Sequence, residues 1–178
     1  MTHDEARGYV LSQAARRGIA AEVVVERGRE LTARAHQHKL EQITQATRGG
    51  IGVRVVVDGR TGYAYTEELT TGALDWMLQE AVDNAALQSA ADGFLPPGQR
   101  TAHRDLLGDG LRGSLEAKAQ MAIGLESTIR EDPRVRQVLY AAYMEREWTV
   151  AVASTAGAAG SYRRGAAGLL ASAVLADG

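Results

Sequence analysis

The sequence contains no cysteine, which excludes disulfides, zinc–thiolate sites, iron–sulfur clusters and cysteine nucleophiles. Aromatic residues make up only 5% of the 178 residues and Phe94 is the sole phenylalanine, so the core must consist mainly of Val, Leu, Ile and Ala. Neither sign of charge dominates. The 20 Lys and Arg residues against 22 Asp and Glu residues give a formal net charge of −2, which leaves no electrostatic footprint for a nucleic-acid backbone.

Long apolar runs are also missing. No stretch approaches the ~18 consecutive apolar residues that suggest a transmembrane helix. The first residues, Met-Thr-His-Asp-Glu-Ala-Arg, lack a basic region followed by an apolar one, so no secretory signal is visible. With 45% hydrophobic and 24% charged residues, the composition is that of a globular protein. We therefore expect a cytoplasmic protein that binds neither nucleic acid nor membrane.

Local signals in the first half of the chain predict two helices and a hairpin. Thr2 and Glu5 have the spacing of a capping box, so we expect an amphipathic helix over residues 3–17. The pair Asp58-Gly59 favours a two-residue hairpin turn, because both central positions of that turn need a positive φ. Apolar residues at helical spacing predict a second helix over roughly 71–90.

Strands are predicted between these helices. The segments with β-branched residues or period-2 alternation are 20–26, 31–36, 40–45, 51–57 and 60–66. Arg27-Gly28-Arg29 is expected to form a turn between the first two segments, and Gly49-Gly50 to interrupt the chain before the fourth.

A Gly- and Pro-rich segment, residues 92–113, reads as a linker or a long surface loop. Ser114 can cap a third helix that ends at Asp132-Pro133, with a buried stripe formed by Leu115, Ala119, Ala122, Leu125 and Ile129. Alternating apolar residues then predict a strand over 138–144, a turn at residues 145–147, a strand from Trp148, and a last strand over about 167–176.

These elements predict an α+β fold with two similar helix-plus-antiparallel-sheet units and a possible internal duplication. We divide the chain into a first unit over 1–91, the linker over 92–113, and a second unit over 114–178. The second unit ends at Asp177-Gly178 without the partner strand that follows Asp58-Gly59. It is therefore expected to be incomplete, either because the chain is the N-terminal part of something larger or because another chain supplies the strand. A frayed end that happens to finish in Asp-Gly is the alternative.

Few residues suggest chemistry. His36 and His38 lie two apart in a predicted strand and could share a metal ion with Glu41, although solvated histidines are the preferred interpretation. Gly49-Gly50-Ile51-Gly52 precedes a strand rather than a helix, so it is interpreted as a turn with close backbone packing and not as a phosphate loop.

Other signals of catalysis are not found in the sequence. Ser154, Ser161 and Ser172 have no Gly-x-Ser-x-Gly context, and the sequence contains no His-Glu-x-x-His motif. Trp76 and Trp148 are interpreted as core or interface anchors. We predict no catalytic, cofactor-binding or metal-binding residue in these 178 residues.

One run is more specific. Residues 50–66, Gly-Ile-Gly-Val-Arg-Val-Val-Val-Asp-Gly-Arg-Thr-Gly-Tyr-Ala-Tyr-Thr, together with the preceding Ala21-Glu22-Val23, resemble the N-terminal signature of the TldD/PmbA family. The ordered similarity continues through the helix with Ala81, Ala85 and Ala86 and into the second unit. There it rests on Ser114, Lys118 and Asp132-Pro133-Arg134-Val135.

The resemblance implies a cytoplasmic peptidase system, whose older label is modulator of DNA gyrase. In that family a TldD-type zinc metallopeptidase subunit and a metal-free TldE/PmbA-type subunit form a heterodimer that encloses a cavity and cleaves short or unfolded peptides. The zinc is carried by a His-Glu-x-x-x-His helix, which this sequence does not contain, so no family ligand maps onto it. Zinc is expected in the catalytic partner or in a C-terminal region. The segment 150–157 is slightly closer to the PmbA type.

The leading hypothesis is therefore a non-catalytic N-terminal region of a TldD/PmbA-type peptidase subunit, with a TldD- or TldE-type subunit or a second copy as partner and peptides as substrates. A stand-alone α+β binding or assembly module that completes its sheet by oligomerising is the alternative. A small hydrolase that uses His36 and His38 is a third, weaker hypothesis.

Overall fold

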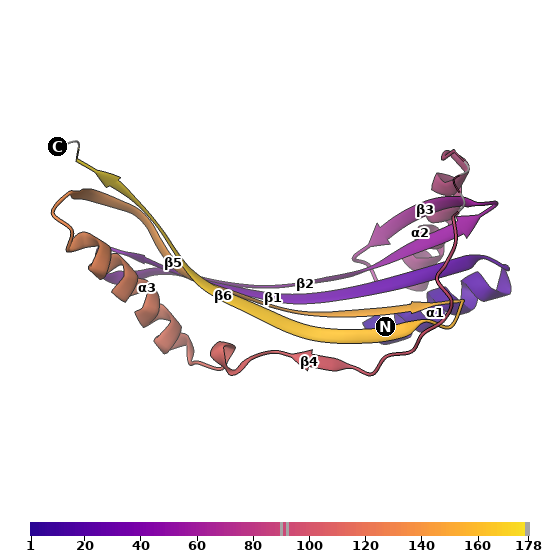
Figure 1. Ribbon diagram of the computed structural model, residues 1–178, viewed down its shortest axis with the longest axis horizontal. Helices are drawn as coiled ribbons and strands as arrows, with labels where there is room; N and C mark the ends of the chain where they lie inside the picture. The colour runs from indigo at the N-terminus through magenta and orange to yellow at the C-terminus, as the bar shows by residue number, and fades with distance from the viewer. Residues whose placement is uncertain (90, 92, 177–178) are drawn as a thin grey trace. The chain divides into compact units, whose positions relative to one another are not determined.

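The computed structural model describes residues 1–89, 91 and 93–176, and it confirms the predicted α+β class (Figure 1). The elements follow one another in the order α1 (His3–Arg16), β1 (Ala20–His36), β2 (Lys39–Val57), β3 (Arg60–Thr66), α2 (Thr71–Ala86), β4 (Arg104–Leu106), a short 3-10 turn (Asp109–Leu111), α3 (Leu115–Arg130), β5 (Val135–Ser154) and β6 (Ala159–Leu175). Within this described part, no helix is long and apolar enough to cross a membrane.

The strands of the described residues form a six-stranded sheet in the order β3-β2-β1-β5-β6-β4. β2 and β3 pair antiparallel from Ile51 with Thr66 to Val57 with Arg60. Asp58 and Gly59 join them with φ values of 49° and 71°, which confirms the predicted hairpin turn.

Side-chain caps start the α-helices α1, α2 and α3. Thr2 and Glu5 form the predicted capping box at α1, in which each side chain bonds the backbone N–H of the other residue. Thr70 accepts a hydrogen bond from the N–H of Ala73 at α2, and Ser114 accepts one from the N–H of Ala117 at α3. The helix starts were therefore readable from local sequence.

Contacts divide the chain into two compact units, and β1, β2, β5 and β6 each contribute a segment to both. Unit 1 comprises Met1–Arg27, Arg48–Asp105 and Thr149–Arg163, and unit 2 comprises Gly28–Thr47, Leu106–Trp148 and the chain from Arg164 on. The division predicted from the sequence, into 1–91, 92–113 and 114–178, was based on the repeated order of helices and strands and not on contacts. It stays a prediction.

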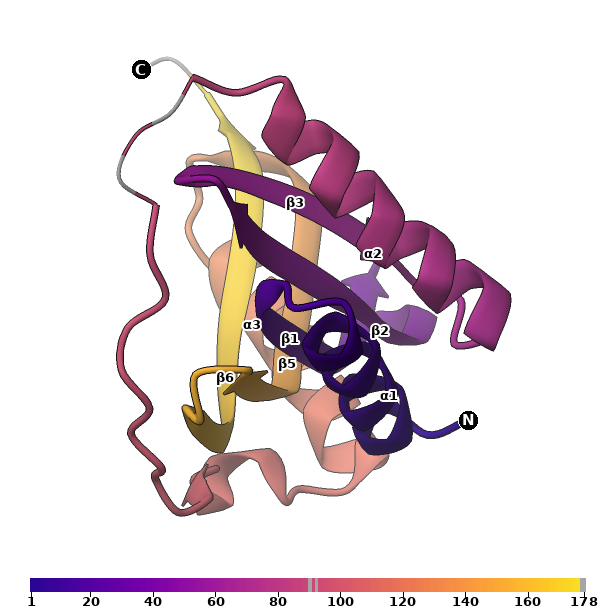
Figure 2. The same cartoon turned by 90° about the vertical axis from the view of Figure 1, so that its right-hand side faces the viewer.

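In unit 1, α1 and α2 pack on one face of the sheet (Figure 2). The core between them is made of Ala, Val, Leu, Ile and Met side chains from both helices and from the inward positions of the strands. Ile51, Val53 and Val55 of β2 all point into this core, as the strand alternation predicts. The opposite face of these strands carries Gly52 and Arg54.

In unit 2, α3 packs on the sheet through a smaller core, formed by Leu31, Ala33, Ala35, Ala122 and Tyr143. The predicted buried stripe of α3 is partly wrong. The buried residues are Lys118, Ala119, Ala122 and Glu126, whereas Leu115 is 42% exposed. The stripe is rotated because Lys118 and Glu126 find buried partners, which apolar periodicity cannot reveal.

The strands are much longer than predicted. β1 runs unbroken through Arg27-Gly28-Arg29, β2 runs through Gly49-Gly50, and β5 runs through residues 145–147, so the turns expected at these places are wrong. Charged residues at 27–29 and 145–147 are compatible with a strand because these positions are exposed or half-buried. The predicted Asp177-Gly178 turn lies outside the described residues.

Candidate functional site

His36, His38 and Glu41, which the sequence offered as a less favoured metal site, do not come together. β1 ends at His36, and Gln37 and His38 form a two-residue turn with φ values of 52° and 58° rather than a strand. The Nδ1 atom of His38 lies 3.0 Å from the Oγ atom of Ser127, and Glu41 is 2.6 Å from the Nε atom of Arg34. The shared-face geometry that the sequence suggested for His36 and His38 is therefore wrong.

A zinc site does not fit the part of the chain that the structure describes. Zinc in hydrolytic enzymes takes three protein ligands and an open position for water. Among residues 1–89, 91 and 93–176, no three His, Cys, Asp or Glu side chains are gathered closely enough to hold a metal ion. We derive no step of chemistry through a metal in this region.

Gly49, Gly50 and Gly52 lie inside β2 and not in a turn. The turn that the sequence predicted at these glycines is therefore wrong. The close packing is present. A Cβ atom at Gly50 would overlap the ring and hydroxyl of Tyr65, and one at Gly49 would lie 2.9 Å from the Nε2 atom of His3. These positions are small because neighbouring side chains lie directly across the strand.

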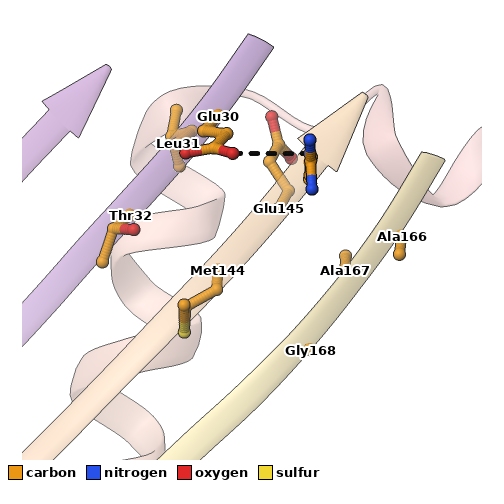
Figure 3. A pocket seen from close by; sticks show the side chains of 9 residues that line it. Glu30, Leu31, Thr32, Met144, Glu145, Ala166, Ala167 and Gly168 are labelled. Atoms are coloured by element: carbon orange, nitrogen blue, oxygen red, sulfur yellow. Dashed lines mark ion pairs between the residues drawn. The ribbon is translucent and has the colours of Figure 1, made fainter. Parts of the chain in front are cut away.

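In unit 2, β1, β5 and β6 together form a hollow of about 340 Å³, which we call the strand hollow (Figure 3). Its lining residues are Glu30, Leu31, Thr32, Met144, Glu145, Arg146, Ala166, Ala167 and Gly168. The short side chains on β6 leave the room, and the thioether chain of Met144 provides an apolar wall. This composition suits an apolar side chain better than a charged ligand.

A weak ion pair borders the strand hollow. The Nε atom of Arg146 lies 3.4 Å from the Oε1 atom of Glu30, with side chains 52% and 39% exposed, so solvent screens the attraction. The guanidinium groups of Arg146 and Arg164 lie 5.2 Å and 4.3 Å from the centre of the Trp148 ring. Both cations therefore lie within cation–π distance of the Trp148 ring.

Behind the strand hollow, a buried ion pair ties β5 to α3. The Nζ atom of Lys118 lies 2.7 Å from the Oε2 atom of Glu145 and also donates a hydrogen bond to the carbonyl oxygen of Leu111. The hydroxyl of Tyr143 donates to the same carboxylate at 2.8 Å. Burial, and then this hydrogen bond, raises the pKa of Tyr143 to about 12. The carboxylate of Glu145 accepts from both Lys118 and Tyr143, which favours a structural role for this cluster over a reactive one.

A second buried carboxylate holds the turn between β1 and β2. Glu126 is fully buried, and its two oxygens accept hydrogen bonds from the N–H groups of Gln37 and His38, each at 2.9 Å. Arg130 bonds the same carboxylate at 2.8 Å. Burial raises the pKa of Glu126, but the hydrogen bonds from His38, Arg130 and Gln37 outweigh it and leave the pKa below its ordinary value.

Unit 1 carries a second hollow of about 480 Å³, which we call the tyrosine hollow. It is lined by Glu22, Val24, Gly52, Val53, Arg54, Tyr63, Ala64 and Tyr65. The rings of Tyr63 and Tyr65 are 62% and 55% exposed, although they sit two residues apart on one strand face. Exposed aromatic side chains in this arrangement are typical of a contact surface.

The charged pair of the tyrosine hollow is better shielded than that of the strand hollow. The Nε atom of Arg54 lies 3.2 Å from the Oε1 atom of Glu22, and each side chain is 24% exposed. Burial, and then the carboxylates of Glu67 and Glu26, raises the pKa of Tyr65, so its hydroxyl stays protonated and able to donate at neutral pH. The hollow thus combines apolar surface with a few fixed polar groups.

Sequence reasoning missed two juxtapositions of histidine with serine, that of His38 with Ser127 described above and that of His103 with Ser161. The Nδ1 atom of His103 lies 2.8 Å from the Oγ atom of Ser161. A serine nucleophile also needs a third group that orients the base, and His103 is exposed to solvent. The pair alone is not a catalytic constellation, and no sequence motif could have revealed it.

Comparison with known proteins connects the tyrosine hollow to a family. The sequence profile described as PmbA/TldA metallopeptidase domain 1 matches residues 21–85, which include all eight residues that line this hollow. No curated protein matches the chain.

Solved structures share the fold. A protein described as a modulator of a DNA gyrase from Thermotoga maritima superimposes with a TM-score of 0.80 and 21% identity over 99% of this chain. A protein with a similar description from Bacteroides thetaiotaomicron gives 0.81 and 18% over 97%, and TldE from Thermococcus kodakarensis gives 0.77 and 16% over 97%. The present chain spans only 40%, 41% and 40% of these three proteins, respectively.

Proposed function

We propose that this chain has a non-catalytic role in a peptidase assembly. The proposal starts from the match of residues 21–85 to the first domain of PmbA/TldA metallopeptidases, which agrees with the resemblance seen in the sequence. The chain is the N-terminal region of a TldD/PmbA-type subunit. It shapes the cavity that receives short or unfolded peptides and contributes to the interface with a TldD- or TldE-type partner. Zinc chemistry is supplied by another part of that assembly, in the cytoplasm.

The tyrosine hollow carries this proposal. The residues that line it lie within the segment that matches the family profile, and its exposed rings are the kind of surface that proteins use to contact other chains. α1 and α2 bury the other face of the same strands, so the rings of Tyr63 and Tyr65 project from a rigid support. A rigid aromatic surface can line a cavity without ordering costs when a partner or a peptide arrives.

The chemistry of the described residues also favours a non-catalytic role. Hydrolysis by zinc needs ligands, an activated water and a general base held in one pocket. The charged groups of unit 2 that are buried, Lys118, Glu145 and Glu126, already satisfy one another and neighbouring backbone groups. They therefore stabilise the sheet and its turn and leave the surfaces free for contact.

Reconstitution tests the proposal. The purified chain is mixed with a TldD-type catalytic subunit, and complex formation, zinc content and hydrolysis of short peptides are measured. We expect the chain to bind the catalytic subunit, to carry no stoichiometric zinc and to hydrolyse nothing alone. Replacing Tyr63 and Tyr65 by serine should weaken the complex or the peptide hydrolysis at least about tenfold.

The matched control is Trp76→Ser, which removes an aromatic ring that is 56% exposed but lies on α2, away from the tyrosine hollow. This variant should behave like the unchanged chain. Tightly bound zinc with strong hydrolysis by the chain alone would contradict the proposal, and so would equal effects of the tyrosine variant and the Trp76 control.

A further inference from the structure

The tyrosine hollow is lined at one position by a residue without a side chain. Gly52 belongs to β2, and the register of the hairpin places it opposite Tyr65 of β3. A Cβ atom at Gly52 would lie 3.7 Å from the carbonyl oxygen of Ala64 and 3.7 Å from the ring of Tyr65, which is ordinary contact distance. Packing within the chain therefore does not require glycine here. Glycine inside a strand is typical of a place where a ligand comes close to the backbone.

The tyrosine rings form a wall beside this glycine. Tyr63 and Tyr65 lie on one face of β3, opposite Arg54 and Gly52 of β2. A Cβ atom at Gly50 would overlap the ring and hydroxyl of Tyr65, so this ring extends from β3 over the backbone of β2. The position of the Tyr65 ring is thereby fixed next to Gly52, while 55% of the residue stays exposed.

Carboxylates outnumber cations around the tyrosine hollow. Glu22 and Arg54 line it and form an ion pair at 3.2 Å, so their charges largely cancel. Burial, and then the carboxylates of Glu67 and Glu26, raise the pKa of Tyr65, so both carboxylates lie near its hydroxyl. Three carboxylates therefore surround the hollow together with one guanidinium. By charge complementarity, this arrangement favours a positively charged ligand.

Aromatic rings next to carboxylates suit the side chain of arginine or lysine. The face of a tyrosine ring attracts a cation, and a carboxylate accepts charge-assisted hydrogen bonds from it. The aliphatic part of the same side chain needs apolar surface, which Val24, Ala64 and the backbone at Gly52 provide. The volume of about 480 Å³ is within the range of about 300–1,000 Å³ that is typical of ligand sites.

We propose that the tyrosine hollow is a subsite for a basic side chain of a peptide, with arginine preferred over lysine. Arginine is preferred because its planar guanidinium stacks on aromatic rings and binds a carboxylate through two hydrogen bonds. The subsite rests on the proposed function, because the side chain belongs to a peptide that the peptidase assembly receives. It adds a selection among such peptides, made by unit 1 through the charges around its tyrosines.

An NMR titration of the isotope-labelled chain tests the subsite without a catalytic subunit. The probes are the blocked peptide acetyl-Ala-Ala-Arg-Ala-Ala-amide and the same peptide with lysine, norleucine or glutamate at the central position. We expect the arginine peptide to bind at least about tenfold more tightly than the norleucine peptide, because only the former gains the cation–π contact and the charge-assisted hydrogen bonds. The amide signals of Gly52 and Tyr65 should shift, and the glutamate peptide should not bind.

A double variant removes the charge and keeps the rings. In Glu26→Gln with Glu67→Gln, the preference for the arginine peptide over the norleucine peptide should fall at least about threefold, since the carboxylates near Tyr65 are gone. The matched control is Glu116→Gln with Glu131→Gln, which makes the same change of net charge at exposed positions of unit 2. This control should keep the full preference.

A second variant fills the hollow. Gly52→Val places a side chain where a Cβ atom meets only ordinary contacts, and it should abolish binding of the arginine peptide. The control is Gly28→Val, another half-buried glycine inside a strand, whose Cβ atom would lie 3.6 Å from the carbonyl oxygen of Glu147. Gly28 does not line the tyrosine hollow, so this variant should bind like the unchanged chain. Circular dichroism checks that both variants are folded.

Reconstitution with a TldD-type catalytic subunit separates the two proposals. The arginine peptide should be hydrolysed with a lower KM than the norleucine peptide, and the double variant at Glu26 and Glu67 should raise that KM while the complex still forms. If no complex forms, the proposed function fails, and the NMR titration of the chain alone still decides on the subsite.

Three results would overturn the subsite. The first is equal affinity for the arginine and norleucine peptides, which would make the hollow a general apolar contact surface. The second is that none of the peptides binds the chain. The third is binding of the arginine peptide that Gly52→Val leaves as tight as Gly28→Val does.

Discussion

The carboxylate of Glu126 offers a quantitative test of how α3 holds the turn between β1 and β2. Gln37 and His38 both adopt positive φ values without being glycine, which costs free energy at each position. Their N–H groups are satisfied by the two oxygens of Glu126, which lies 89 and 88 residues further along the chain. Glu126→Gln keeps the size of the side chain but replaces one of these acceptors by a donor.

We expect this substitution to lower the free energy of unfolding by about 2–4 kcal/mol. Hydrogen bonds to a charged group contribute about 1.5–3 kcal/mol each, and a buried donor left without an acceptor costs about 1–3 kcal/mol. The glutamine retains one good acceptor, so at least one turn N–H or Arg130 loses its partner. With a urea m value of about 2 kcal/mol/M, the midpoint of unfolding should fall by about 1–2 M.

The assay can follow unit 2 alone. The two tryptophans divide between the units, since Trp76 lies in unit 1 and Trp148 in unit 2. In a Trp76→Phe background, fluorescence during urea unfolding reports on Trp148. Glu131→Gln, the same chemical change at the exposed C-cap of α3, is the control and should change stability by less than about 0.5 kcal/mol.

The effect should depend on pH with a definite sign. Because the pKa of Glu126 is lower in the folded protein than in the unfolded chain, its stabilising contribution is complete above the unfolded pKa, which is about 4.3. It is lost as the pH falls through the folded pKa. The difference between the unchanged chain and Glu126→Gln should therefore be constant from neutral pH down to about pH 5 and shrink below about pH 4. A loss under about 0.5 kcal/mol at neutral pH, or a difference that grows on acidification, would refute the reasoning.

Three further predictions concern other described contacts. Lys118→Met should lower the free energy of unfolding by about 3–5 kcal/mol, because it leaves the carboxylate of Glu145 buried and without its cation. The double variant with Glu145→Gln should lose less stability than the sum of the two single variants, which a double-mutant cycle of urea unfolding measures. One tyrosine should ionise near pH 12 in an ultraviolet titration and disappear in Tyr143→Phe. Because the folded pKa is raised, its stabilising contribution is present below about pH 10 and is lost as the pH rises toward 12. Gly62→Ala should lower the free energy of unfolding by about 1–3 kcal/mol, because its Cβ would overlap the backbone of α2. Gly124→Ala, in the open middle of α3, is the control and should raise the free energy of unfolding by up to about 1 kcal/mol. Thermal unfolding measures both, and a Gly62→Ala variant of unchanged stability would contradict the packing described.

Interactions between residues close in sequence were predictable. The caps at Thr2 and Ser114 and the turn at Asp58-Gly59 each depend on side chains or φ preferences within a few residues, so the sequence determines them directly. The family signature belongs to the same class, because the Gly-Val-Arg and Gly-Tyr-Ala pattern of β2 and β3 reads along two neighbouring strands. The resemblance drawn from it is confirmed over residues 21–85.

The strand hollow was less predictable than the tyrosine hollow, because it joins strands that are distant in sequence. The strand hollow brings together residues 30–32, 144–146 and 166–168, and no periodicity within one segment indicates that they meet. The interpretation of His36 and His38 as neighbours on a strand was wrong for a related reason. It assumed that the strand continued, whereas the chain turns at Gln37 and His38.

By itself, then, the sequence determined the α+β class, the helix starts, the Asp58-Gly59 hairpin and the similarity of residues 21–85 to the first domain of PmbA/TldA metallopeptidases. These features rest on local geometry, hydrogen bonds over three residues and a linear motif. Only the tertiary structure decided where the chain turns between β1 and β2. Gln37 and His38 carry no turn signal of their own, and their positive φ values are stabilised by a carboxylate from α3 that the fold alone brings to them. The residues around position 37 do not reveal a hydrogen bond whose acceptor lies almost ninety residues further along the chain.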